Sequence, residues 1–475
     1  MRNLLLSSLV LSRTRFAATE EDEENGEQNK TRPCFAPRGG KISCAPARDE
    51  ENGLAMVCFD DGRMVRARCD ATTSEEARET KSFLLKDTEE VEDQDQETNE
   101  RQKRNAVSVE RLPDLRATFV ALECGELLLV NDGSSSSSSS SPLDIERVAD
   151  VPSGCVSAKF SPDGQMCAVL TKSGKILIMN GDFYLLNERK SCLDDVDEDD
   201  EDDEEEEMIK SGNITWRNDG ESFCVYCTTS KDGKNHLRTY SRDKLEILGR
   251  GDVEHDNDET GPGKMCENAA IAWQPRGALI AVSGVASSSN SSSSSSSSSN
   301  GKGEDNNKET RLPCVVFYEK NGLRRSSLLM RGFQSSTITH LSWSVDSLTL
   351  AITTCDEEMR ETAVSIWTRG NANWTCKRCI EDNYNNLENK EICGSSSSSS
   401  SSKYAIFDAI HPNTLRIVST NGEDEVDVNT HTFVWEDCTS SDLGTAAVID
   451  GEILKLTPFS RCVVPPPMCD YSLRF

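Results

Sequence analysis

Short runs of alternating apolar and polar residues recur along the chain, and each ends in an aromatic residue followed by a turn. A period of two, in segments rich in β-branched and aromatic residues, predicts β-strands. The turn Ser161-Pro-Asp-Gly164 favours reversal because proline presets φ, aspartate bonds nearby backbone and glycine accepts positive φ. The clearest runs are residues 156–160, 214–216, 271–273 and 341–343, which end in the aromatic anchors Phe160, Trp216, Trp273 and Trp343.

Further strand-like segments follow each anchor, so the repeated unit contains several strands. A second apolar run comes directly after the turn, and a third lies further along the chain. Repeated units of short antiparallel strands predict a β-propeller, whose sheets bury their faces against one another. The second runs are 167–170, 223–226, 279–282 and 348–352, and the third runs are 175–179, 236–240, 314–318 and 363–367.

Weaker units of the same kind bracket these four. Two units, each made of two apolar runs, precede them, and one more unit follows them near the carboxy terminus. The total is about seven, within the ~4–8 units of known propellers. The pattern therefore predicts an all-β, WD40-type β-propeller of about seven blades. The weaker units are 54–58 with 64–65, 117–121 with 127–130, and 404–418 with 432–435.

Low-complexity segments interrupt the strand pattern. Such segments cannot bury enough apolar surface to offset the entropy of ordering, so we expect disordered loops. We expect a first propeller over residues 1–394 and a poly-Ser linker at 395–402. Residues 403–475 should form the last blade, the start of a second propeller, or both. The expected disordered insertions lie near 72–104, 134–141, 194–207 and 287–310.

The chain is strongly acidic, with 52 Lys and Arg against 82 Asp and Glu and a net charge of −30. An acidic surface repels phosphate backbones, so direct binding of nucleic acid is not expected. The 19 cysteines are about 4% of the chain, below the ~8–10% of small disulfide scaffolds. Many lie in apolar runs, which indicates free thiols and a reducing compartment.

The first sixteen residues contain three arginines and no acidic residue. This composition fits either a first β-strand or a transit peptide. No apolar run approaches the ~18 residues that a membrane span needs. The chain is therefore expected to be soluble and not to bind a membrane.

Two CxxC pairs, Cys224 with Cys227 and Cys376 with Cys379, each have the spacing of half a zinc site. Both lie in strand-like runs, where residues i and i+3 point to opposite faces, so we expect no metal. The five histidines are scattered, and the sequence contains no HExxH, GxSxG or phosphate-loop motif. We expect no catalytic, cofactor-binding or metal-binding residue, no cofactor and no enzymatic activity. The acidic run Asp194–Glu207 is either a solvated loop or a segment that attracts a basic partner.

Several motifs resemble the largest subunit of the Elongator complex. They arrive in that family's order and extend over the chain apart from its insertions. The resemblance of the amino-terminal motif implies that the first residues are part of the propeller. The motifs are Met1–Leu4, Trp216–Gly220, Trp273–Ile280, Phe317–Leu323, Ala446–Gly451, Leu456–Phe459 and Val463–Met468.

The resemblance implies a non-catalytic scaffold that supports modification of wobble uridines in tRNA. In that family two propellers precede a helical region that dimerises the subunit, and this chain looks like the first propeller and the beginning of the second. The implied partners are the other Elongator subunits, including the catalytic one, with tRNA reached only through the complex. Homodimerisation is expected only with the carboxy-terminal region. The expected location is the cytoplasm, with the nucleus as a second site.

Two alternatives remain open. The first is an enzyme on a propeller, with polar residues gathered at the central channel. The second is a generic WD-repeat adaptor of another assembly, such as a ubiquitin ligase.

Overall fold

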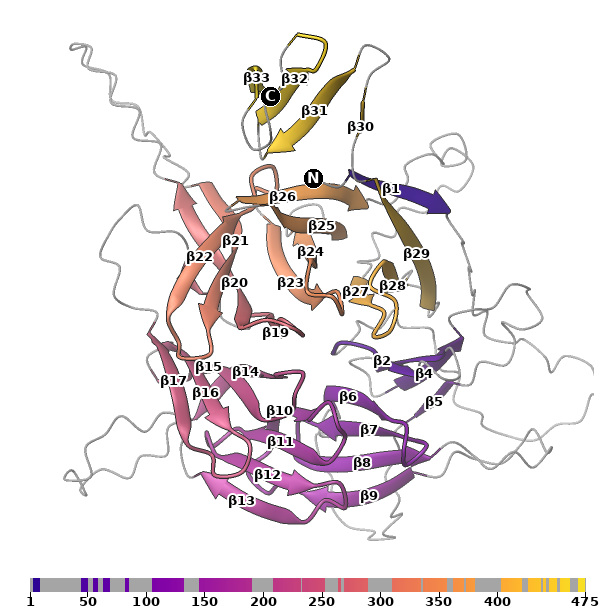
Figure 1. Ribbon diagram of the computed structural model, residues 1–475. Coiled ribbons are helices and arrows are strands. Elements are labelled where there is room, and N and C mark those ends of the chain that lie inside the picture. Colours follow the sequence, from indigo (N-terminus) through magenta and orange to yellow (C-terminus); the bar gives the residue numbers. More distant parts are fainter. Residues whose placement is uncertain are drawn as a thin grey trace, which may run out of the picture.

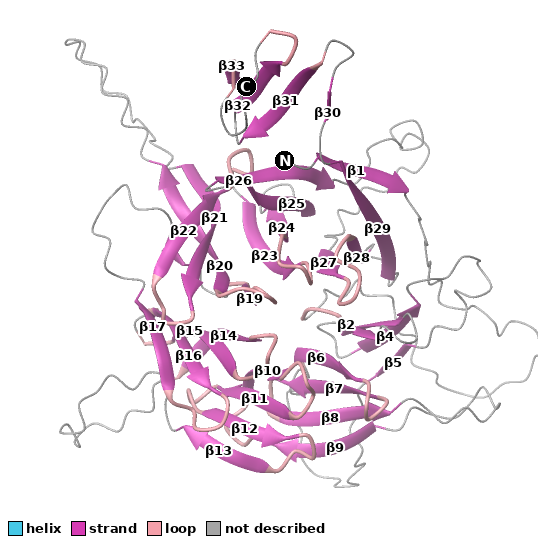
Figure 2. Ribbon diagram, in the orientation of Figure 1, coloured by secondary structure: helices cyan, strands magenta, loops and turns pink. Residues whose placement is uncertain are grey.

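In a computed structural model the chain folds into short antiparallel sheets (Figures 1 and 2). Within the described segments, no helix has the length and apolarity that a membrane crossing requires. The structure describes residues 3–8, 44–49, 54–58, 63–68, 82–84, 105–131, 145–189, 208–231, 233–252, 264–265, 269–288, 310–334, 336–356, 362–370, 373–380, 403–420, 426–436, 439–440, 444–450, 453–461 and 469–474.

Six sheets follow one another along the chain, and each runs outward from the central channel in sequence order (Figure 1). The first two contain β2 (Ala47–Asp49), β3 (Leu54–Cys58), β4 (Arg63–Arg68) and β5 (Ser82–Leu84), then β6 (Ala106–Leu112), β7 (Ala117–Leu122), β8 (Glu126–Asn131) and β9 (Ile145–Asp150). The next two contain β10 (Cys155–Phe160), β11 (Met166–Thr171), β12 (Ile176–Asn180) and β13 (Leu185–Arg189), then β14 (Ile209–Trp216), β15 (Ser222–Thr229), β16 (Asn235–Ser241) and β17 (Ile247–Asp252).

The fifth sheet has two short inner strands, β18 and β19, which both pair with β20. Its strands are β18 (Lys264–Met265), β19 (Ile271–Trp273), β20 (Leu279–Ser288), β21 (Thr310–Glu319) and β22 (Arg324–Leu329). The sixth sheet contains β23 (Ser336–Trp343), β24 (Thr349–Asp356), β25 (Thr362–Gly370) and β26 (Asn373–Ile380).

The seventh sheet joins the two ends of the ring. Its inner strands are β27 (Lys403–Phe407), β28 (Thr414–Thr420) and β29 (Val426–Glu436), and its outer strand is β1 (Asn3–Ser8). Leu4 pairs with Trp435 and Leu5 with Val434. The predicted first strand is therefore confirmed, and it closes a ring of seven sheets. The prediction of an all-β propeller with about seven blades is confirmed.

An eighth sheet lies outside the ring (Figure 1). It contains β30 (Thr439–Ser440), β31 (Thr445–Asp450), β32 (Ile453–Pro458) and β33 (Tyr471–Arg474). Residues 403–436 thus pair within the ring and residues 439–474 do not. The domain boundaries drawn around the third serine tract stay a prediction. That tract, the other serine tracts and the acidic run lie outside the described residues.

The core lies between neighbouring sheets, because each sheet of the ring has a neighbour on both faces. All eight residues of β15 are buried for this reason. The anchor Trp216 packs with Leu170 and Ile178 of the preceding sheet, and the rings of Phe119 and Phe160 meet edge to face at 5.0 Å. The three tryptophan anchors are at most 8% exposed. The anchors therefore belong to the blade core.

Candidate functional site

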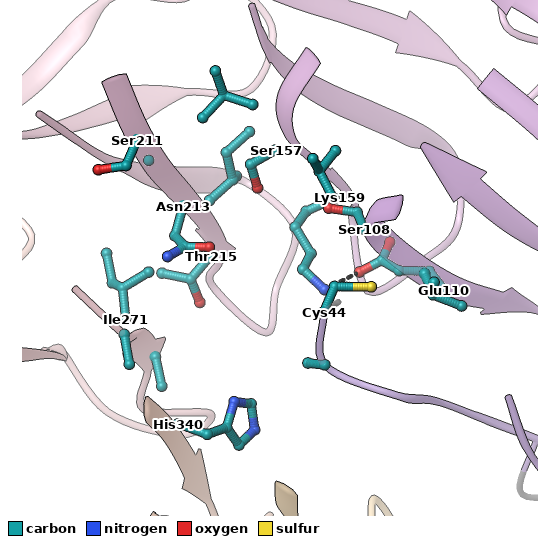
Figure 3. A pocket seen from close by; sticks show the side chains of 18 of the residues that line it. Cys44, Ser108, Glu110, Ser157, Lys159, Ser211, Asn213, Thr215, Ile271 and His340 are labelled. Atoms are coloured by element: carbon teal, nitrogen blue, oxygen red, sulfur yellow. Dashed lines mark ion pairs between the residues drawn. The ribbon is translucent and has the colours of Figure 1, made fainter. Parts of the chain in front are cut away.

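A cavity of about 830 Å³ occupies the centre of the ring (Figure 3). It is lined by the first strands β6, β10, β14, β19 and β23, together with Cys44 and Tyr404. In sequence terms, the lining residues hold fixed positions relative to the aromatic anchors. One set comes directly before an anchor and another comes three residues before it. The first set includes Lys159, Thr215, Ala272 and Ser342, and the second includes Ser157, Asn213, Ala270, His340 and Tyr404, which precedes Phe407.

Side chains of the first set hold adjacent blades together. The backbone N–H of Trp273 donates to Thr215 Oγ1 at 3.1 Å, and the N–H of Phe407 donates to Ser342 Oγ at 3.0 Å. In each case the acceptor lies one sheet earlier in the ring. These contacts pair backbone groups at the inner edges of the sheets, where burial without a partner would be costly.

Glu110 has the same role in β6 and carries a charge as well. Its Oε2 accepts the N–H of Phe160 at 2.5 Å, and its Oε1 pairs with Lys159 Nζ at 3.0 Å. Figure 3 shows this ion pair beside Cys44. Desolvation acts to lower the pKa of Lys159, but the charge and hydrogen bond of Glu110 outweigh it and raise that pKa. Lys159 is therefore a paired cation at neutral pH.

Two neutral rings complete this part of the wall. Burial, assisted by the charge of Lys159, lowers the pKa of His340 to about 4. Its ring lies edge to face with Tyr404, with centroids 5.4 Å apart, and burial raises the pKa of the Tyr404 hydroxyl. At neutral pH both rings are uncharged. His340 is thus poorly suited to accept a proton near pH 7.

A second ion pair also lines the cavity. Lys172 Nζ lies 2.9 Å from Glu123 Oε1, and Asn105 Nδ2 donates to Glu123 Oε2 at 3.1 Å. Glu123 directly follows β7 and Lys172 directly follows β11, so this pair, like Glu110 with Lys159, joins two successive blades. Among the residues that the structure describes, no group of three or more His, Cys, Asp or Glu could hold a metal ion. The absence of catalytic, cofactor and metal residues stays a prediction.

The cavity brings together residues that the sequence patterns did not single out, including Glu110, Lys159 and Tyr404. His340 was noted only as one of five scattered histidines, and His255 lies outside the described residues. Lys159, His340 and Tyr404 could have been found from the sequence, because each lies at a fixed number of positions before an aromatic anchor. The position alone does not indicate a chemical function, because the residue types at those positions differ from blade to blade.

The two CxxC pairs behave differently. Cys227 packs in the cluster shared with the preceding sheet and Cys224 in the cluster shared with the following sheet, so these two side chains point to opposite faces of β15, as predicted. The same prediction is wrong for Cys376 and Cys379, because a β-bulge in β26 lies between them. An extra residue in one strand shifts the alternation of side chains by one position.

Five of the large exposed apolar side chains lie in turns at one end of the ring, each in a different sheet. The first strands of a propeller run in the same direction, so turns that join first to second strands and third to fourth strands share one rim. We call this the turn rim and define it by the turns that hold Leu115, Tyr184, Leu323, Leu348 and Ile410, which are 48–71% exposed. Met208, 45% exposed, precedes β14 and therefore lies at the opposite rim.

The comparisons with known proteins agree with this architecture. The family model of the ELP1 first N-terminal beta-propeller matches residues 51–205 and 194–393. This chain belongs to the Elongator complex protein 1 family. The model of the ELP1 N-terminal second beta-propeller matches residues 448–475, which include most of the eighth sheet.

Relatives with this name occur in distant organisms. Elongator complex protein 1 of Schizosaccharomyces pombe is 26% identical over 391 residues, covering 77% of this chain and 27% of the relative. The protein of Drosophila melanogaster is 25% identical over 404 residues, covering 78% and 27%. The chain thus spans about a quarter of the length of these relatives. The WD40 domain of Toxoplasma gondii coronin shares the fold, with a TM-score of 0.50, 12% identity and 84% of each chain covered.

Proposed function

We propose that this chain is a non-catalytic scaffold part of an Elongator assembly, which supports modification of wobble uridines in tRNA. The observation that carries the proposal is the match of the family model over residues 51–393. The proposed partners are the other Elongator subunits, including the catalytic one. Contact with tRNA is indirect and the proposed location is the cytoplasm. Dimerisation of the subunit would require a carboxy-terminal helical region.

A scaffold of this kind acts by holding its surface turns at fixed positions, where other subunits can bind. Hydrogen bonds between blades, such as those that Glu110, Thr215 and Ser342 accept, hold the ring together. A rigid ring places its turns at fixed positions, where partners dock through a few buried anchors. The apolar side chains of the turn rim offer anchors of this type, and we assign that rim to a partner subunit.

The test is affinity purification of the tagged chain from its own cells, with mass spectrometry of the proteins that co-purify. Recovery of the other Elongator subunits is the expected result. Loss of the chain should then lower the modified wobble uridines of total tRNA, which nucleoside analysis by mass spectrometry measures. Recovery of a ubiquitin ligase or another assembly, without Elongator subunits, would overturn the proposal.

A further inference from the structure

The cysteine pair of β26 lies on the outer strand of the sixth sheet. Both Cys376 and Cys379 are exposed. The strand order in this sheet is β23-β24-β25-β26, so β26 pairs only with β25 and its other edge has no neighbouring strand of the same sheet. Reagents in solution can therefore reach both thiols.

The register between β25 and β26 shows the bulge. Trp367 pairs with Cys376, Ile366 with Arg378 and Ser365 with Cys379, so Lys377 is the extra residue. Cys376 and Cys379 thus lie opposite Trp367 and Ser365, which are two residues apart. Residues two apart on a strand share a face. The bulge therefore places the two cysteines on the same face of the sheet.

Packing on both faces of β26 supports this assignment. Trp374, two residues before Cys376, stacks on Phe317 at 4.7 Å and packs with the cluster that contains Trp367. Ile380, next to Cys379, packs with Val364 and Ile366 in the cluster of the other face. The two cysteines therefore share the face of Trp374.

The spacing of the pair suits a bond between the two sulfurs. The cysteines span two residues of β25, and a rise of ~3.3 Å per residue places their Cα atoms about 6.6 Å apart. Disulfides join Cα atoms that are roughly 4.4–6.8 Å apart. An outer strand at a bulge can adjust locally, because its outer edge is not held by a further strand of its sheet.

We propose that Cys376 and Cys379 form a reversible dithiol–disulfide pair, an oxidation site on the outer strand of the sixth blade. The oxidant is a small-molecule disulfide of the glutathione type. One thiolate attacks a sulfur of the oxidant and displaces one glutathione thiolate. The second cysteine thiolate attacks the protein sulfur of the mixed disulfide and displaces the other. The protein loses two electrons and two protons, and the oxidant becomes two thiols.

The environment of Cys376 sets the pH dependence of this reaction. Local burial of the thiol raises its pKa, and hydrogen bonds with the backbone of Arg378 and Ile366 and the charge of Lys377 oppose that effect. The attacking species is the thiolate. Oxidation at Cys376 therefore accelerates as the pH rises toward that pKa.

The chain contains its own matched control. Cys224 and Cys227 have the same spacing, but they are buried and lie on opposite faces of a strand without a bulge between them. Burial raises the pKa of Cys224 well above its ordinary value. If spacing alone decided oxidation, both pairs would react, whereas the proposal requires a response only from the exposed pair.

The experiment treats the folded full chain with oxidised glutathione at mildly alkaline pH, quenches with acid and alkylates the free thiols. Cleavage at acidic residues keeps Cys376 and Cys379 in one peptide, because the flanking sites are Glu361 and Glu381. Mass spectrometry should show that this peptide has lost two hydrogens and regains them with a dithiol reductant. The peptide with Cys224 and Cys227 should remain fully alkylated.

Single substitutions separate the steps. In Cys376→Ser or Cys379→Ser, the remaining cysteine should stop at a stable mixed disulfide with glutathione. Cys224→Ser should leave oxidation of the exposed pair unchanged. The proposal is overturned if the wild-type peptide also stops at the mixed disulfide, if both thiols stay free, or if the chain retains zinc that only these substitutions remove.

Discussion

Phe160 donates its backbone N–H to Oε2 of Glu110 in the preceding blade, with 2.5 Å between nitrogen and oxygen. The other carboxylate oxygen pairs with Lys159, the neighbour of Phe160. One side chain of β6 thus satisfies a backbone donor and a cation of β10. Removing it would leave both groups without that partner in the wall of the central cavity.

Substitution of Glu110 should therefore destabilise the ring. Hydrogen bonds to charged groups contribute about 1.5–3 kcal/mol, so Glu110→Ala should lower the free energy of unfolding by an amount in this range. Glu110→Gln keeps an acceptor and should cost less. Denaturant unfolding followed by tryptophan fluorescence measures both changes. Glu146→Gln, at an exposed position of β9, is the control. Equal stability of Glu110→Ala and the control would refute this role.

The indole nitrogens of the tryptophan anchors should contribute differently to the stability of the fold. Trp216 Nε1 donates to the carbonyl of Lys159 at 2.8 Å, whereas the buried Nε1 of Trp273 has no acceptor among the described residues. Trp216→Phe breaks a hydrogen bond and Trp273→Phe removes only a donor. Because an unpaired buried polar group costs about 1–3 kcal/mol, Trp216→Phe should be the more destabilising change. A thermal unfolding series on the two variants tests the order, and the reverse order would contradict it.

The strand pattern and the propeller could be predicted because they depend on local alternation and turn chemistry. Phe160, Trp216 and Trp343 mark the ends of inner strands through their sequence neighbours alone. The pairing of β1 with β29 joins residues that are far apart in the sequence, and no local pattern predicted it. The family resemblance implied only that the first residues belong to the propeller.

The central site was less predictable. Glu110 and Lys159 meet because two successive blades stack, and neither has a partner near it in sequence. The bulge at Lys377 was also invisible, since the CxxC pattern reads the same in a regular strand and in a bulged one. Contacts that depend on the register between strands or on the stacking of blades cannot be predicted from the local pattern of one sequence.

His340 should make the stability of the ring depend on pH. Its pKa is lowered to about 4 by burial and by Lys159, whereas an unfolded histidine titrates near ~6.5. A depressed pKa means that the unfolded state binds the proton more readily in this interval. Stability from neutral His340 is therefore fully present above pH ~6.5 and is lost as the pH falls toward 4.

The measurement is the free energy of unfolding across that interval. His340→Gln should flatten the decline, and His431→Gln should flatten it too, because burial and then Arg378 lower the pKa of His431. An identical slope in wild type and His340→Gln would exclude the histidine as its source.

The closing strand β1 should protect the edge of β29. Deletion of residues 3–8 removes the pairing that runs from Asn3 with Glu436 to Ser8 with Thr432. Backbone amides of β29 that β1 covers would then face water and exchange faster. Hydrogen–deuterium exchange should rise in peptides that cover residues 432–436 and stay unchanged in β10–β13, on another part of the ring. Uniformly faster exchange would instead indicate loss of the whole propeller, and no change would show that β1 does not close it.

The turn rim should carry a partner subunit of the proposed assembly. Ile410 and Leu348 are 67% and 57% exposed in turns of that rim, and an aspartate there would have to be desolvated on docking, which is costly for an unpaired charge. Ile410→Asp with Leu348→Asp should reduce recovery of one Elongator subunit in the affinity purification. Exposed substitutions change stability by only about 0.5 kcal/mol, so the thermal midpoint should barely move. Met208→Asp, at the opposite rim, should leave recovery intact, and an equal loss with this control would remove the assignment of the turn rim.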